Sequence, residues 1–263
     1  MDEFPAERTV IVTGAVALRG IGRATVHFLA ERGWNIGVID LDDAASKAVA
    51  QELTEKYGVK AAGAGANVAD EVSVRAAIDE LEAALPQIVA LTNVAGVSSP
   101  VPYLELDSAE WDRVMNINLN SVFWMCQNFI KLRGKKGGII INISSIEAIL
   151  PFKEELVQYS VSKAGVIALT RSLARDYGRK GFRANVILPG AIRTPGTTSL
   201  AKDAIANFRL DLMKTGYDFQ TRLALGRWGH PDEIAKVALF LASDLASYVQ
   251  GAMIPVDGGF LSS

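Results

Sequence analysis

The sequence predicts a doubly wound α/β fold, with one parallel sheet of seven strands covered by helices on both faces. Apolar, β-branched runs alternate with longer helix-period segments along the chain. Such short apolar runs are typical of parallel strands that are buried on both faces. The length of 263 residues is one that a single α/β domain reaches, so we expect one domain over residues 1–263.

The seven strands are expected in the runs TVIVTG, WNIGVID, VKAAGAGANV, IVALTNVAG, GGIIINISS, FRANVILPG and GAMIPVDGG, all of them buried. Apolar residues at helical spacing predict helices between these runs, at 20–32, 43–57, 70–85, 108–133, 157–179 and 231–243. Segment 193–228 interrupts the alternation after a strand end, so we expect it to form a lid over the substrate. Ligands of such folds bind at the carboxyl ends of the strands.

Composition argues against several classes of partner. The formal net charge is -2 and 49% of the residues are hydrophobic, so we expect neither a nucleic-acid partner nor disorder. No apolar run approaches the roughly 20 residues that a membrane helix needs, so we expect no membrane partner. Cys126 is the one cysteine, and its apolar setting predicts a buried structural thiol. A reducing cytoplasm fits this composition best.

A glycine-rich turn follows the first expected strand, in the sequence TGAVALRGIGRAT. Gly14, Gly20 and Gly22 would let the backbone approach a dinucleotide pyrophosphate, which the N-terminus of the next helix would bind. The simpler interpretation is that the three glycines are needed only for packing.

Asp40 ends the second expected strand, 18 positions after Gly22. A carboxylate there would accept hydrogen bonds from the adenosine ribose and repel a 2′-phosphate, which predicts NAD(H) rather than NADP(H). Arg19 in the glycine turn favours the opposite choice, because it could approach that phosphate.

Several motifs, in order, resemble the short-chain dehydrogenase/reductase family: TGAVALRGIG, TNVAG, YSVSK, NVILPGAIRT, GRWGHPDEIA and VQGAMIPVDGG. The resemblance covers almost the whole chain. It implies a Rossmann-type fold and an NAD(H)-dependent exchange between a secondary alcohol and a ketone. The glycine turn departs from the family, with five residues between Gly14 and Gly20 where three are usual. Asn67 stands where the family usually has Asp.

The resemblance assigns cofactor binding to Gly14, Arg19, Gly20, Ile21, Gly22, Asp40, Asn67, Val68, Asn93, Ala95, Gly96, Tyr159, Lys163, Pro189, Gly190, Ile192 and Thr194. For Asn67 we expect the side-chain oxygen to accept from the adenine amino group.

Proton transfer is expected from Tyr159. Tyr159 and Lys163 are four residues apart and share one helix face, so the ammonium should lower the pKa of the phenol. The resemblance makes Ser145, rather than Ser144, the hydroxyl that holds the substrate oxygen. It also makes Asn118, rather than Asn116 or Asn120, the residue that kinks a helix and holds a water of the proton relay.

The pocket for the small-molecule alcohol or ketone should be lined by Val97, Ser98, Ile146, Glu147, Phe152 and Ala191, with Phe208, Met213 and Tyr217 of the lid. The simpler interpretation of Glu147 is a solvated loop carboxylate. The alternative is an acceptor for a substrate hydroxyl, as in a polyol or sugar. We expect no metal site.

Helices 108–133 and 157–179 carry apolar residues beyond one core stripe, including Trp111, Phe123, Trp124 and Phe129. The resemblance implies that these helices form a dimer face within a homotetramer. Two alternatives to the NAD(H) enzyme stay open: an NADPH-dependent ketoacyl or carbonyl reductase, and a non-catalytic nucleotide-binding redox regulator.

Overall fold

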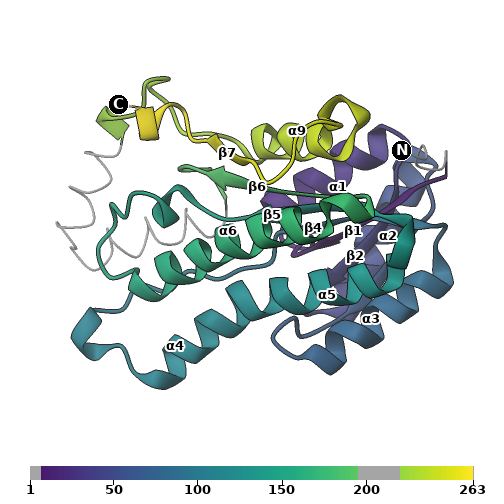
Figure 1. Cartoon of the computed structure of the whole chain (residues 1–263), viewed down its shortest axis with the longest axis horizontal. Helices are drawn as coiled ribbons and strands as arrows, with labels where there is room; N and C mark the ends of the chain where they lie inside the picture. Colours follow the sequence, from purple (N-terminus) through teal and green to yellow (C-terminus); the bar gives the residue numbers. More distant parts are fainter. Residues whose placement is uncertain (1–6, 195–219, 263) are drawn as a thin grey trace.

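The structure of the chain, a computed structural model, describes residues 7–194 and 220–262 (Figure 1). Its centre is one sheet of seven strands in the order β3-β2-β1-β4-β5-β6-β7, and every neighbouring pair is parallel. The prediction of a doubly wound seven-stranded sheet is confirmed. The strands are β1 (Thr9–Thr13), β2 (Asn35–Asp40), β3 (Ala61–Gly65), β4 (Ile88–Asn93), β5 (Gly138–Ile143), β6 (Phe182–Pro189) and β7 (Met253–Val256).

Helices cover both faces of the sheet (Figure 1). One face carries α1 (Ile21–Glu31), α2 (Asp43–Tyr57) and α9 (Pro231–Ala242), and the other carries α3 (Glu71–Ala84), α4 (Ser108–Met115), α5 (Ser121–Arg133) and α6 (Val157–Tyr177). The helix expected at 108–133 is interrupted by a π-helical turn, Asn116–Asn120, between α4 and α5. The remaining expected helices begin and end within two residues of their observed bounds.

The sheet separates two hydrophobic clusters. Val10 and Val12 of β1 point to the cluster under α1, α2 and α9, whereas Ile11 points to the cluster under α3, α5 and α6. This alternation follows from the two-residue period of a strand. Helices on both sides therefore hold the carboxyl ends of the strands rigidly at one edge.

Two expectations about exposure are wrong. β7 is not fully buried: Met253 is 43% exposed, because β7 forms the edge of the sheet. Phe129, expected on a dimer face, is completely buried and packs edge-on against Phe182. Phe123, by contrast, is 44% exposed. The homotetramer stays a prediction.

Two further expectations concern Cys126 and the lid. Cys126 is buried, and burial raises the pKa of its thiol to about 12, which confirms a structural thiol.

Residues 195–219, with Phe208, Met213 and Tyr217 of the expected lid, lie outside the described residues. Within the described ranges, no helix is long and apolar enough to cross a membrane.

Candidate active site

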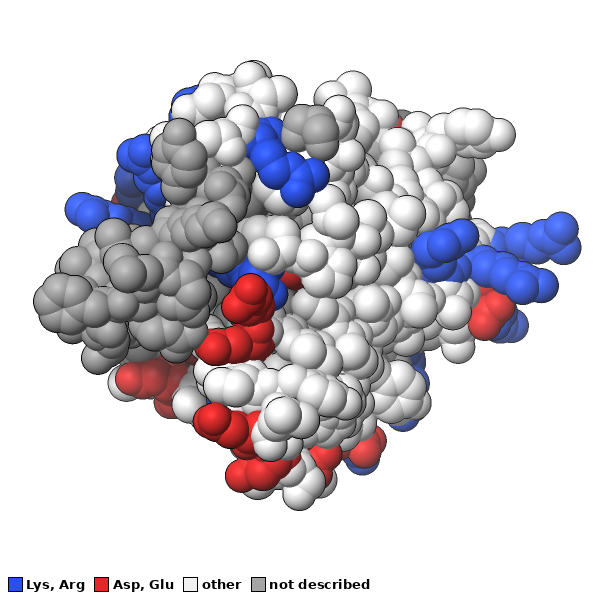
Figure 2. Space-filling view, turned by 90° about the vertical axis from the view of Figure 1, so that its left-hand side faces the viewer, with Lys and Arg blue, Asp and Glu red and all other residues white. Residues whose placement is uncertain are grey.

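The carboxyl ends of the strands lie on the side of the molecule where α6 begins (Figure 1). Figure 2 looks onto this side and shows acidic side chains gathered below and beside the grey atoms. Most of the surface visible in that view is uncharged. The loops after β1, β4, β5 and β6 bring most of the predicted site residues to this edge.

The glycine turn after β1 is a close contact between backbones. Gly14 has a φ of +70°, and a Cβ on it would lie 2.8 Å from Ala95 Cα. A Cβ on Gly22 would lie 2.2 Å from the Gly14 carbonyl oxygen. Packing thus requires glycine at both positions.

The effect of a side chain at Gly22 is testable. We expect Gly22→Ala to lower the free energy of unfolding by about 2–3 kcal/mol, because the Gly14 backbone must move away from the new methyl group. Thermal or urea unfolding measures this change. Gly33→Ala is the control, since a Cβ at that position would meet no atom within 4 Å, although the φ of +77° carries a strain of its own. Equal stability of Gly22→Ala and the wild type would contradict the packing described.

The N-terminus of α1 fits the pyrophosphate of a nicotinamide dinucleotide. Gly20 is the N-cap residue, no side chain caps the helix, and its first turn carries no acidic residue. The first N–H groups and the positive end of the helix dipole can therefore bind an anion. Ile21 and Gly22 begin this helix.

A hydrogen bond joins the lengthened glycine turn to the Asp40 side chain. Val16 N–H donates to Asp40 Oδ2 at 2.9 Å, and Leu41 N–H donates to Asp40 Oδ1 at 2.8 Å. A carboxylate has about four lone-pair sites, so Asp40 can still accept from ribose hydroxyls. Arg19 lies in the same turn with a φ of +61°. Asp40, which favours NAD(H), and Arg19, which favours NADP(H), therefore both lie at this turn.

The other expected cofactor residues differ in whether their side chain or only their backbone can contact a cofactor. The Asn67 Oδ1 atom accepts from Ala69 N–H at 3.1 Å and keeps a second lone pair. The Asn93 side chain is turned into the interior, where Nδ2 donates to Asn142 Oδ1 at 2.8 Å, so only its backbone can face a cofactor. Val68, Ala95, Pro189 and Gly190 follow or end strands at this edge, and Ile192 forms a bridge with Gly229 beside Thr194.

Tyr159, Lys163 and Ser145 come together at this edge. Tyr159 and Lys163 lie on α6, and the Lys163 Nζ atom is 5.9 Å from the centre of the tyrosine ring. Ser145 follows β5, and its hydroxyl interacts with the Tyr159 phenol and lowers its pKa. Ser144 is occupied elsewhere, because its hydroxyl donates to the Lys163 carbonyl at 2.7 Å. This supports the choice of Ser145 over Ser144.

The π-helical turn places Asn118 beside Lys163. The Asn118 Oδ1 atom accepts from Val97 N–H at 2.8 Å, and its Nδ2 donates to the Val97 carbonyl at 2.9 Å. A Cβ on Gly96 would lie 3.1 Å from Asn118 Oδ1 and 3.2 Å from Lys163 Nζ, so both side chains converge there. Asn116 and Asn120 bond to each other instead.

The surroundings of Tyr159 act against the lowered pKa that the sequence predicts. Burial raises the pKa of the phenol, Ser145 lowers it, and the charge of Glu147 raises it further. Lys163 does not contribute to this shift, and burial lowers the pKa of Lys163 itself to about 8. Its Nζ donates to the Ile143 carbonyl at 3.1 Å. Burial thus opposes the effect that we expect from Lys163, and a lowered pKa of the phenol stays a prediction for the complex with the cofactor.

The chain resembles known proteins along nearly its whole length. It matches the family described as enoyl-(acyl carrier protein) reductase over residues 14–261. It is 36% identical over 250 residues to a 3-oxoacyl-(acyl-carrier-protein) reductase of Aquifex aeolicus, covering 95% of each chain. The identity to a D-threitol dehydrogenase of Mycolicibacterium smegmatis is also 36%, with 96% of this chain and 92% of the relative covered. A solved structure from Beutenbergia cavernae, described as an NAD(P)-dependent gluconate 5-dehydrogenase with NADP at low occupancy, has a TM-score of 0.87 and 32% identity, with 97% of each chain covered. The chain belongs to the short-chain dehydrogenase/reductase family.

Membership of the short-chain dehydrogenase/reductase family sets the class of reaction. The protein is an oxidoreductase that acts on alcohol or carbonyl groups. A nicotinamide cofactor is expected for this family, and the turn between β1 and α1 fits one.

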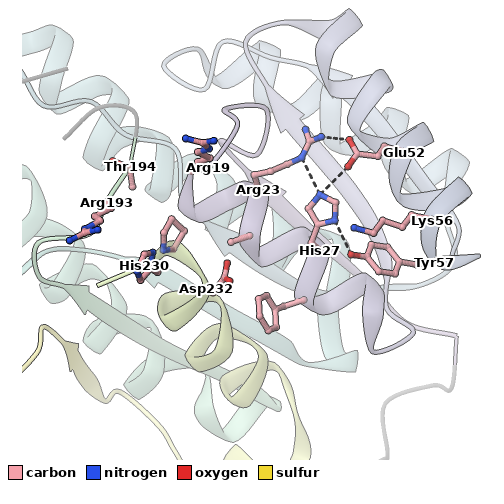
Figure 3. Close-up of a pocket in the computed structure, with 14 residues that line it drawn as sticks. Arg19, Arg23, His27, Glu52, Lys56, Tyr57, Arg193, Thr194, His230 and Asp232 are labelled. Atoms are coloured by element: carbon pink, nitrogen blue, oxygen red, sulfur yellow. Dashed lines mark hydrogen bonds and ion pairs between the residues drawn. The ribbon is translucent and has the colours of Figure 1, made fainter. Parts of the chain in front are cut away.

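A groove of about 1080 Å³ runs along the outer side of α1 in this dehydrogenase/reductase (Figure 3). Arg19, Gly20 and Thr194 line it together with His27. His27 hydrogen-bonds with Tyr57 and receives a hydrogen bond from Arg23, which also pairs with Glu52. Burial lowers the pKa of His27. This network ties α1 to α2 and holds none of the residues expected to transfer protons.

Sequence reasoning missed Thr13, which shapes the site through two hydrogen bonds, and misplaced Ile146. The Thr13 hydroxyl accepts from both Val94 and Ala95 N–H, at 3.0 and 3.1 Å, and so fixes the loop after β4 against β1. Ile146, expected in the pocket, is 1% exposed and belongs to the core. The position of Thr13 directly before the glycine turn was the available signal for its two hydrogen bonds.

Proposed function

We propose that this protein is an NAD(H)-dependent oxidoreductase that interconverts a secondary alcohol and a ketone, with Tyr159 as the acid/base. The observation that carries the proposal is the convergence of Ser145, Tyr159 and Lys163 beside the glycine turn. A non-catalytic nucleotide-binding regulator would have no use for this arrangement.

Each side chain of the site has its own role in proton transfer or in positioning the substrate. In alcohol oxidation, the Tyr159 oxygen takes the hydroxyl proton of the substrate, while Ser145 holds the same substrate oxygen by a hydrogen bond. Lys163 would hold the nicotinamide ribose, and Asn118 holds the loop of Val97 beside Lys163. A bound nicotinamide would supply the hydride acceptor.

Asp40 supports a preference for NAD(H). A 2′-phosphate beside this carboxylate would be repelled, whereas ribose hydroxyls can donate to it. Arg19 and the NADP bound by the Beutenbergia cavernae neighbour favour the alternative, an NADPH-dependent ketoacyl or carbonyl reductase.

The two cofactor preferences can be separated by substitution. We expect the wild type to have a higher kcat/KM with NAD than with NADP, and Asp40→Ala to reduce that ratio about 10- to 100-fold, as for a lost hydrogen bond to a charged group. Asp42→Asn is the control, because Asp42 is an exposed neighbouring carboxylate that caps α2. A wild type that prefers NADP would contradict the proposed cofactor.

A further inference from the structure

Glu147 is a buried carboxylic acid beside the proposed acid/base. It lies in the short turn Ile146–Ala148 after β5, and it is 3% exposed. Its N–H donates to the Ser145 Oγ atom at 3.2 Å, and its charge raises the pKa of Tyr159. The solvated loop carboxylate expected from the sequence is therefore wrong. The carboxyl group lies within electrostatic range of the phenol.

One oxygen of this carboxyl group has no partner. Oε2 accepts from Phe152 N–H at 3.2 Å, and the backbone N–H of Lys153 also interacts with the carboxyl group and lowers its pKa. Oε1 is buried and has no hydrogen-bond partner within the part of the chain that the structure describes. Burial also raises the pKa of the group. Leaving such an oxygen unpaired in the interior is unfavourable, and a bound ligand that donates to it would relieve this cost.

The chemistry of the neighbours restricts the donor. Ser145 and Tyr159 are assigned to the reacting oxygen of the substrate, so the donor must be another group close to it. Lys153 acts on Glu147 electrostatically, so a cationic donor such as an ammonium would meet a like charge. A neutral hydroxyl satisfies the carboxyl oxygen in either protonation state.

We propose that Glu147 is a specificity-determining residue that binds a second substrate hydroxyl, on the carbon next to the reacting one. This inference rests on the proposed function and deepens it: the substrates are vicinal diols or longer polyols and their ketones. A simple secondary alcohol would bury Oε1 without a donor.

The test compares butane-2,3-diol with butan-2-ol, all stereoisomers included, because the two alcohols differ in the second hydroxyl. We expect the wild type to favour the diol in kcat/KM, and Glu147→Leu to reduce the diol-to-alcohol ratio about 10- to 100-fold. Glu147→Gln, whose amide can still accept and donate, should keep most of the ratio. Glu154→Leu removes an exposed carboxylate from the same loop and should change nothing.

A binding measurement accompanies the kinetics and shows whether the variants fold. With NADH present, which cannot oxidise the polyol, threitol should raise the thermal unfolding temperature of the wild type and of Glu147→Gln, but not of Glu147→Leu. Equal loss of both substrates in Glu147→Leu, or a wild type that prefers butan-2-ol, would overturn the inference. If the wild type oxidises neither alcohol, the proposed function fails, and the inference about Glu147 is then tested by threitol binding alone. An increase in the unfolding temperature that is lost in Glu147→Leu supports the inference. No increase in the wild type overturns it.

Discussion

Replacing Tyr159 by Phe is expected to lower kcat/KM by about 10²- to 10⁴-fold, the usual contribution of a positioned general acid or base. Phe keeps the aromatic ring and removes only the hydroxyl that would exchange the proton. Binding of the reduced cofactor, followed by its fluorescence, should stay within a few-fold of the wild-type value. This combination also separates the enzyme from a non-catalytic redox regulator, in which Tyr159→Phe would alter no turnover.

A second tyrosine provides the control for this variant. Tyr177 lies at the C-terminal end of the same helix, packed edge-on against Phe182. We expect Tyr177→Phe to keep wild-type turnover. Full activity in Tyr159→Phe, with the cofactor still bound, would remove Tyr159 from the chemistry.

Replacing Lys163 by Met is expected to abolish activity and yet stabilise the protein without cofactor. Lys163 is 4% exposed, and burial lowers its pKa from 10.5 to about 8. Charging it inside the folded protein at neutral pH costs at most about 3 kcal/mol. Met removes this cost but leaves the Ile143 carbonyl without its donor, a loss of about 1 kcal/mol. We therefore expect a net gain of about 2 kcal/mol in the free energy of unfolding.

The pH dependence of this gain identifies its cause. The folded state holds the Lys163 proton less tightly than the unfolded state, so the penalty is complete below pH 8 and disappears as the pH rises to 10.5. Urea unfolding of both proteins across this range should show the gain shrinking and then reversing to a deficit of about 1 kcal/mol at high pH, because the neutral amine of Lys163 still donates to the Ile143 carbonyl. Lys131→Met, at an exposed lysine of α5, is the control. A Lys163→Met protein less stable than the wild type at pH 7 would contradict the buried ammonium.

The fold was largely predictable because its strands are short apolar runs, and the turns between them carry Gly, Asp and Ser. The β1 residues Val10, Ile11 and Val12 pack on both faces, as a buried parallel strand requires. The exposure of Met253 was not predictable from its own run, because it depends on the position of β7 at the sheet edge. Phe129 likewise packs on Phe182, a residue of a strand far along the chain.

The candidate site was predictable to the level of motifs and not of contacts. The motif YSVSK predicts that Tyr159 and Lys163 share one helix face, because residues four apart in a helix are neighbours whatever the rest of the fold. The pKa values of both residues, the attachment of Asp40 to Val16 and the burial of Glu147 depend on distant segments that meet only in the folded chain. The hydrogen bonds of Asn118 with Val97 and Ser162 likewise join segments that are far apart in the chain.

The most direct test of the central claim follows the transferred hydrogen. A vicinal diol carrying deuterium on its carbinol carbons is incubated with NAD and the protein, and the reduced nicotinamide is analysed by mass spectrometry. We expect one deuterium on the nicotinamide for each ketone formed, and almost no labelled cofactor formed in the same time with Tyr159→Phe. Undeuterated reduced cofactor, or equal transfer by Tyr159→Phe, would contradict the mechanism.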